Sequence, residues 1–148
     1  MKKKILIFIG MIAIITGCSA QTQEIDIEML AKELLENVTF EDELTAVEQA
    51  MGSKIYEVED DVKNIVYISS GATSEEIALF EFQNEEAAKT GYEKAKDRVE
   101  RQKENYATYI PEEVSRLDQA IIEKYGKYVI LCITNDQSAE QIIQKYIQ

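Results

Sequence analysis

Residues 65–82, which read IVYISSGATSEEIALFEF, decide the fold of this 148-residue chain. Residues 65–69 and 77–82 are rich in β-branched, aromatic and other apolar side chains, a composition typical of strands. Residues 70–74 lie between them and contain Gly71, which tolerates the positive φ that a tight turn requires. The stretch therefore predicts a β-hairpin.

A long helix is predicted immediately after this hairpin. Asn84 is a good N-cap, and the carboxylates of Glu85 and Glu86 suit the positive end of the helix dipole. Small and apolar side chains recur on one face as far as Val99, which suits a helix that packs closely on a sheet. Because this pattern weakens after Val99, we expect the helix to fray or leave the sheet before Pro111.

The last third of the chain repeats this plan. Residues 120–125 and 128–134 predict a second hairpin that turns at Gly126, and residues 137–147 predict a closing helix. At an offset of 51 residues the strand ends, the N-caps and the helix faces of the two units fall in register. An internal duplication and a chance similarity between two units of the same kind both explain this register.

The segment before the first hairpin begins with apolar residues at three- and four-residue spacing, from Ile27 to Val38. This spacing predicts an amphipathic helix, and Asp26 is a plausible N-cap for it. Residues 40–51 are less regular and predict a second short helix or an irregular segment that Gly52 ends. The predicted fold class is α+β, with an N-terminal helix, two strand-strand-helix units and a four-stranded antiparallel sheet on which the helices pack.

The first residues are typical of a secretory signal, with lysines at positions 2–4 followed by the apolar residues 5–15. An apolar run of about 11 residues is too short for a transmembrane helix, which needs about 20. The residues at its end, Ile15-Thr16-Gly17-Cys18, resemble the lipobox of bacterial lipoproteins. This resemblance implies that the chain is cleaved before Cys18 and that its thiol carries a diacylglyceryl group.

These features divide the chain into three predicted parts. Residues 1–17 are a lipoprotein signal peptide, residues 18–25 are a lipidated tether, and residues 26–148 are a single α+β domain. We expect the protein at the outer face of the cell membrane of a bacterium. The two acyl chains on Cys18 make the membrane itself a partner.

Composition limits the chemistry that the domain can perform. Removal of the three leader lysines would leave 13 basic and 28 acidic residues, a formal net charge of −15, which excludes nucleic acid as a partner. The sequence has no histidine, the commonest general base and metal ligand. After lipidation Cys132 is the only thiol, and its apolar neighbours predict that it is buried. We therefore expect no catalytic residue, no metal site and no cofactor.

Four further segments carry a second resemblance, namely VYISSGAT at 66–73, EEI at 75–77, YIPEEV at 109–114 and YVIL at 128–131. They are similar to an uncharacterised family of small lipoproteins from Gram-positive, clostridia-like bacteria, which is catalogued as a domain of unknown function. The resemblance spans about residues 27–147. It implies the fold and the cellular location, and it carries over no catalytic or binding residues.

Two segments supply candidate binding residues, and these are Ser69, Ser70, Gly71, Thr73, Tyr106 and Tyr109. Successive backbone N–H groups of the turn at residues 69–73 can form a small anion-binding nest, and an ordinary hairpin turn is the alternative. Residues 105–118 are predicted to be a long loop whose tyrosines suit a contact surface. The alternative for this loop is that it folds back over the sheet and completes the core.

The predicted function is that of a non-catalytic module that binds an unknown protein or small molecule at the membrane. Two carboxylate clusters, residues 41–43 and 57–61, suit either a solvated acidic surface or weak cation binding. One alternative is a histidine-free envelope hydrolase that uses carboxylates. Another is an accessory subunit of an envelope complex.

Overall fold

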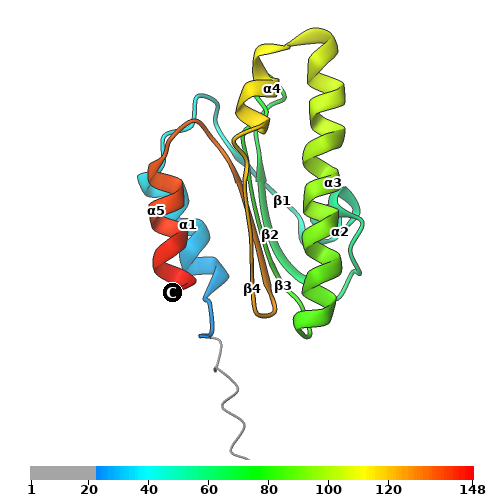
Figure 1. Cartoon of the computed structure of the whole chain (residues 1–148), viewed down its shortest axis with the longest axis vertical. Coiled ribbons are helices and arrows are strands. Elements are labelled where there is room, and N and C mark those ends of the chain that lie inside the picture. Colours follow the sequence, from blue (N-terminus) through cyan, green and yellow to red (C-terminus); the bar gives the residue numbers. More distant parts are fainter. Residues whose placement is uncertain (1–22) are drawn as a thin grey trace, which may run out of the picture.

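Residues 23–148 are the part of the chain that the structure, a computed structural model, describes. They form a five-stranded antiparallel sheet in the order β1-β2-β3-β5-β4, with helices on both of its faces (Figure 1). The strands are β1 (Thr45–Val47), β2 (Lys63–Ile68), β3 (Glu76–Glu81), β4 (Ile121–Tyr125) and β5 (Tyr128–Ile133). The helices are α1 (Ile27–Asn37), α2 (Gln49–Tyr56), α3 (Glu85–Tyr109), α4 (Glu112–Leu117) and α5 (Ser138–Tyr146).

Both predicted hairpins are confirmed. β2 pairs with β3, and the turn between them contains Gly71 at a φ of 98°. β4 pairs with β5 around Gly126, whose φ of 53° also lies in the left-handed region that favours glycine. The two hairpins join through β3 and β5, where Glu76 lies opposite Ile133. The middle of the sheet is therefore built from β3 and β5, whose residues are nearly all buried.

The sheet has five strands instead of the predicted four, because Thr45–Val47 pairs with β2 at one edge. The prediction for residues 40–51 misses this strand, and the helix that follows it begins only at Gln49. Gly52 lies inside that helix and does not end it. A Cβ atom at Gly52 would overlap Asn64 Oδ1 of β2, so the glycine lets helix and strand approach closely.

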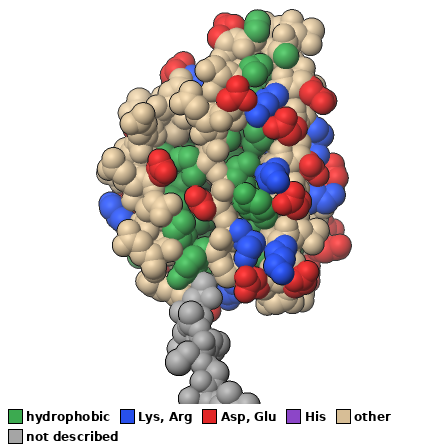
Figure 2. Space-filling view, in the orientation of Figure 1, with side chains coloured by type: hydrophobic (Ala, Val, Ile, Leu, Met, Phe, Trp, Pro, Cys, Tyr) green, Lys and Arg blue, Asp and Glu red, His purple; other side chains and the backbone are tan. Residues whose placement is uncertain are grey.

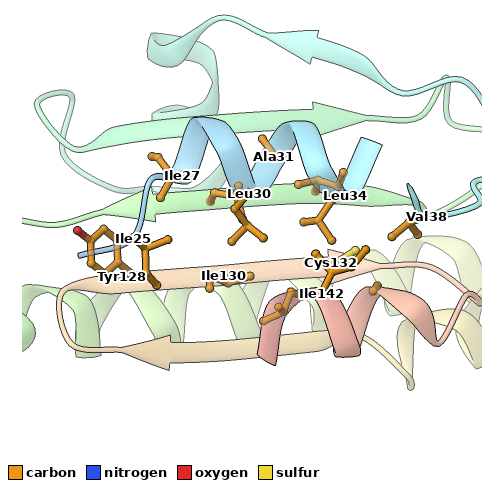
Figure 3. Close-up of a cluster of buried hydrophobic side chains, with 14 residues drawn as sticks. Ile25, Ile27, Leu30, Ala31, Leu34, Val38, Tyr128, Ile130, Cys132 and Ile142 are labelled. Carbon is orange, nitrogen blue, oxygen red and sulfur yellow. The ribbon is translucent and has the colours of Figure 1, made fainter. Parts of the chain in front are cut away.

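The domain has two cores because β3 and β5 are buried on both faces. Alternate residues of a strand point to opposite faces. Ile77 of β3 accordingly packs with α1 and α5, whereas Phe80 packs with α2 and α3. Figure 3 shows the first of these cores, in which side chains of α1, β5 and α5 meet. Cys132 lies buried in it, as predicted, and burial raises the pKa of its thiol to about 12.

The two strand-strand-helix units are not copies of each other in three dimensions. α3 covers one face of the sheet together with α2, while α5 covers the other face beside α1 (Figure 1). Ala88 and Ala139, which fall in register at the offset of 51 residues, therefore lie in different cores. Because β3 and β5 are antiparallel neighbours, a half-turn about an axis perpendicular to the sheet would superimpose one hairpin on the other. Such a rotation leaves every helix on the face of the sheet where it started. It cannot superimpose α3 on α5, so the offset of 51 residues has no counterpart in the positions of the two helices.

The segment predicted to be a long loop, residues 105–118, is mostly helical. α3 continues as far as Tyr109, and α4 begins directly after Pro111. α3 extends past its apolar face because Gln102 and Tyr106 are buried there and bond to the start of β3 and the turn before it. The prediction that these tyrosines lie on a loop is therefore wrong.

The start of the folded domain includes residues that were predicted as tether. Ile25 is buried in the first core, and Glu24 accepts a hydrogen bond of 2.7 Å from the Tyr128 hydroxyl. Asp26 is the N-cap of α1, as predicted, and accepts hydrogen bonds from two backbone N–H groups of the first turn. The predicted N-cap Asn84 of α3 is confirmed in the same way, by a bond of 2.9 Å from a backbone N–H.

Cys18 and the predicted signal peptide at residues 1–17 lie outside the described residues. Within residues 23–148 no helix is both long enough and apolar enough to cross a membrane. Lipidation at Cys18 therefore stays a prediction.

Gly91 of α3 faces the ring of Phe82, and a Cβ atom at this position would overlap that ring. We predict that Gly91→Ala lowers the free energy of unfolding by about 1–2 kcal/mol, because overpacking a buried contact outweighs the better helix propensity of alanine. Urea denaturation followed by circular dichroism measures the change. Thr90→Ala, at an exposed position of the same turn, is the matched control and should change stability by less than about 0.5 kcal/mol. An unaltered stability of Gly91→Ala would contradict the close packing.

Candidate functional site

Two neighbouring carboxylates are buried at the start of β3. Glu75 is 2% exposed and Glu76 is 1% exposed. A buried charge without a partner costs several kcal/mol, so each carboxylate needs hydrogen-bond donors or a cation. Adjacent residues of an extended chain point to opposite sides. Glu75 accordingly reaches residues 41–42, and Glu76 reaches α2 and α3.

Glu76 is the acceptor of a network beneath α2 and α3. The Tyr56 hydroxyl donates to its Oε1 at 2.5 Å, and burial raises the pKa of that tyrosine well above its ordinary value. Arg98 Nη2 donates to Oε2 at 2.9 Å, and Gln102 Nε2 donates to the same oxygen at 3.0 Å. The network therefore joins β3 to both helices through one carboxylate.

Glu75 holds the turn before β3 against the segment that leads into β1. Its carboxylate accepts the backbone N–H groups of Glu41 at 3.0 Å and Asp42 at 2.9 Å. The Thr73 hydroxyl also donates to it, at 3.1 Å. Residues 41–42 and the turn are thus linked by a buried anion that belongs to the chain.

Asp42 makes the opposite link, from the segment before β1 to the turn. Its Oδ2 accepts the backbone N–H of Ser70 at 2.9 Å and the Ser70 hydroxyl at 2.5 Å. The bond from the Ser70 hydroxyl, followed by the bond from its backbone, lowers the pKa of Asp42. Ser69 Oγ donates to the carbonyl of Thr73 at 2.6 Å. Where the sequence predicts an anion-binding nest, the carboxylate of Asp42 therefore occupies part of it.

α4 closes the same region with a second buried carboxylate. Glu113 accepts the backbone N–H and the hydroxyl of Ser74 at 2.7 and 2.8 Å. The buried Arg116 donates to Glu113 at 2.5 Å and to Glu41 at 2.5 Å. The Arg116 guanidinium also lowers the pKa of Glu41. One cation thus bridges α4 and the segment before β1.

The candidate tyrosines meet the candidate turn. Tyr106 donates from its hydroxyl to the carbonyl oxygen of Thr73 at 2.5 Å and to that of Gly71 at 3.3 Å. Burial, and then the neighbouring Tyr109, raise the pKa of Tyr106 to about 12. The ring of Tyr109 is stacked on that of Tyr106, with centroids 5.5 Å apart, and Tyr109 itself is 63% exposed. Two segments that the sequence suggests separately therefore form one surface.

We call this surface the distal surface and define it by the exposed residues Ser70, Gly71, Ala72 and Tyr109. Ser69, Thr73 and Tyr106 support it from below through the bonds just described. Sequence reasoning missed the residues that hold it in place, which are Asp42, Glu75, Glu113 and Arg116. One sequence feature points to them: Glu75 and Glu76 directly precede an apolar strand, and acidic side chains that are buried there require donors or cations as partners.

The chain enters the domain at the opposite end of the sheet. The backbone N–H of Gln23 donates to the Tyr125 hydroxyl at 3.2 Å, and Glu24 lies 3.3 Å from Lys127 Nζ. Both contacts are at the β4–β5 hairpin, which lies beside the last residues of β3. The turn of the distal surface leads into the first residues of β3, at the opposite end of the sheet (Figure 1). A six-residue strand separates the two ends by about 20 Å.

Most basic side chains elsewhere on the described domain are paired with carboxylates. Figure 2 shows acidic and basic side chains together over α3, where Lys96 lies 3.0 Å from Glu93 and Lys103 lies 2.9 Å from Glu100. In residues 23–148 no three acidic or cysteine side chains are grouped so as to hold a metal ion.

Comparison with known proteins gives one match. A family model described as "Domain of unknown function (DUF4358)" matches residues 36–134, about two thirds of the chain. The matched segment includes the whole sheet, the buried carboxylates and the distal surface. No curated protein and no solved structure matches the chain.

The Glu76 network makes a prediction about stability. We expect Glu76→Ala to lower the free energy of unfolding by about 3 kcal/mol, because it leaves Arg98 and the buried Tyr56 hydroxyl without their acceptor. Glu86→Ala is the comparison variant. It removes a carboxylate from an exposed pair with Lys89 on α3 and should lower the free energy of unfolding by less than about 0.5 kcal/mol. Guanidinium denaturation at pH 7 compares the two. Equal losses would mean that the buried network contributes no more than a surface pair.

Proposed function

The chain belongs to the family described as a domain of unknown function (DUF4358), and on this premise we propose that it is a lipid-anchored binding module of the bacterial cell surface. The proposed anchor is Cys18, and the proposed contact surface is the distal surface. The partner is a protein or another molecule outside the membrane. The observation that carries the proposal is that the chain enters the domain at one end of the sheet and the distal surface lies at the other.

Chain length supports this orientation. Cys18 precedes Gln23 by five residues, which span at most about 18 Å. An acylated Cys18 would therefore hold the β4–β5 hairpin near the bilayer, and the distal surface would face away from it. The acidic composition supports the same arrangement, because anionic headgroups repel a domain with an excess of carboxylates.

The construction of the distal surface supports a role in binding. Tyr109 is a large exposed aromatic side chain whose ring is held by stacking on Tyr106. A tyrosine that is already ordered loses little entropy when a partner covers it, and such residues often dominate contact surfaces. The turn beside it is fixed by Asp42, Glu75 and Glu113, so its shape is set before a partner arrives.

The polar side chains near the distal surface are already hydrogen-bonded within the domain, which supports binding over catalysis. The Ser70 hydroxyl donates to the carboxylate of Asp42, and this bond lowers the pKa of Asp42, which makes that carboxylate a weak base for activating a serine. The carboxylates of Glu75, Glu76 and Glu113 are buried as acceptors of internal hydrogen bonds. A hydrolase that used them would have to break the contacts that hold the fold.

The proposed anchor is tested at Cys18. We predict that Cys18→Ala abolishes incorporation of labelled fatty acid and leaves the precursor uncleaved at position 18, because the acyl chains are attached through this thiol. Metabolic labelling of cells and mass spectrometry of the N-terminus measure both effects. Cys132→Ala is the matched control and should be labelled like the wild type, since that thiol is buried. Equal labelling of Cys18→Ala would remove the anchor from the proposal.

The proposed contact surface is tested at Tyr109. A photo-crosslinking amino acid at position 109 should give a discrete crosslinked product in intact cells, whereas the same amino acid at Met29 should not. Met29 is a fair control because it is 60% exposed and lies on α1, across the sheet from α3. Addition of an unlabelled Tyr109→Ala protein should compete poorly for the partner, while Met29→Ala competes normally. Identical products from both positions would contradict a specific distal surface.

A further inference from the structure

A groove of about 420 Å³ lies on the other end of the domain, away from the distal surface. It is bounded by residues 57–62, which connect α2 to β2, by the end of β3, and by the first half of α3. The backbone N–H of Phe82, one of its lining residues, donates to the carbonyl oxygen of Lys127 in the β4–β5 hairpin. The groove is therefore at the end where the chain enters the domain.

Small residues on α3 leave this space open. Ala87 and Gly91 lie one helical turn apart and both line the groove. Because Gly91 has no side chain, α3 approaches the ring of Phe82 closely without filling the space beside it. Val62 and Phe82 are buried lining residues, so part of the wall is apolar. The volume lies in the range of sites for small organic molecules.

The exposed lining of the groove is negatively charged. Glu57, Glu59 and Asp61 line it together with one cation, Lys94. Glu57 is already paired, at 3.2 Å with Lys94 and at 3.4 Å with Arg101. Among residues 23–148 no cation pairs with either of the other two carboxylates, which are exposed; Asp61 accepts a bond of 3.0 Å from Gln83.

We propose that this groove binds a small organic cation, an ammonium or guanidinium group on an apolar stem. The stem lies against Phe82 and Val62, where it leaves water, and the cation lies between Glu59 and Asp61, which have no other cationic partner. An anionic ligand is repelled by the carboxylates of Glu59 and Asp61, and a fully apolar ligand leaves these two carboxylates uncompensated. The choice of a cation thus follows from the charge of the rim, and the choice of a stem from the apolar wall.

The test uses the protein as purified from the cells that make it, placed in nanodiscs of zwitterionic lipid, and the probe 2-phenylethylamine. The anionic isostere 3-phenylpropanoate serves as the comparison ligand. Saturation-transfer difference NMR and titration calorimetry measure binding, with empty nanodiscs to subtract partition into lipid. We expect saturable binding of the amine and none of the carboxylate. Equal binding of both probes, or no saturable binding of the amine, would overturn the proposal.

Variants locate the site. The double variant Glu59→Gln with Asp61→Asn should lower the affinity for 2-phenylethylamine by about tenfold or more, because two charge-assisted contacts are lost. Glu104→Gln with Glu112→Gln makes the same change of net charge at exposed positions near the distal surface and should leave the affinity unchanged. Ala87→Leu keeps every charge but fills the groove, and it should also abolish binding. An equal effect of the two double variants would mean general attraction to an acidic protein and would reject the groove.

Discussion

Glu75 and Glu76 stand side by side at the buried start of β3, and through them α2, α3 and the segment before β1 are tied to the sheet. Because neighbouring strand residues point in opposite directions, one carboxylate faces the segment before β1 and the other faces α2 and α3. Each is acceptable in the interior only while its donors are in place. The ordering of the turn, of α3 as far as Arg98 and Gln102, and of residues 41–42 therefore depends on this pair.

The sheet separates two regions with different character. At one end the turn around Gly71, α4 and the end of α3 are locked together by internal carboxylates, and Tyr109 is left exposed on a rigid support. At the other end the chain enters beside the β4–β5 hairpin, and the rim of the groove near Phe82 carries Glu59 and Asp61, with which no cation of residues 23–148 pairs. Carboxylates thus accept internal hydrogen bonds at one end of the sheet, whereas at the other end two of them have no cationic partner among the described residues.

Much of the fold is predictable because its signals are local. Asp26 and Asn84 cap helices as predicted, and the apolar runs of both hairpins form paired strands, of which β3 and β5 meet in the middle of the sheet. β1 is missed because its three residues, two of which are exposed, are too few to show a periodic pattern. The helical nature of residues 105–118 is missed because α3 is prolonged there by buried polar contacts of Gln102 and Tyr106, which an apolar stripe does not reveal.

By itself the sequence determined the type and approximate position of most elements, the turns at Gly71 and Gly126, and the burial of Cys132, since these follow from neighbouring residues and hydrophobicity. Only the tertiary structure decided that α3 and α5 cover opposite faces, that Tyr106 binds the turn at Thr73, and that Asp42 occupies the predicted nest. The physical reason is that these contacts join residues far apart in the chain. Their partners are chosen by packing and by the need to satisfy buried charge, and neither is written in any local pattern.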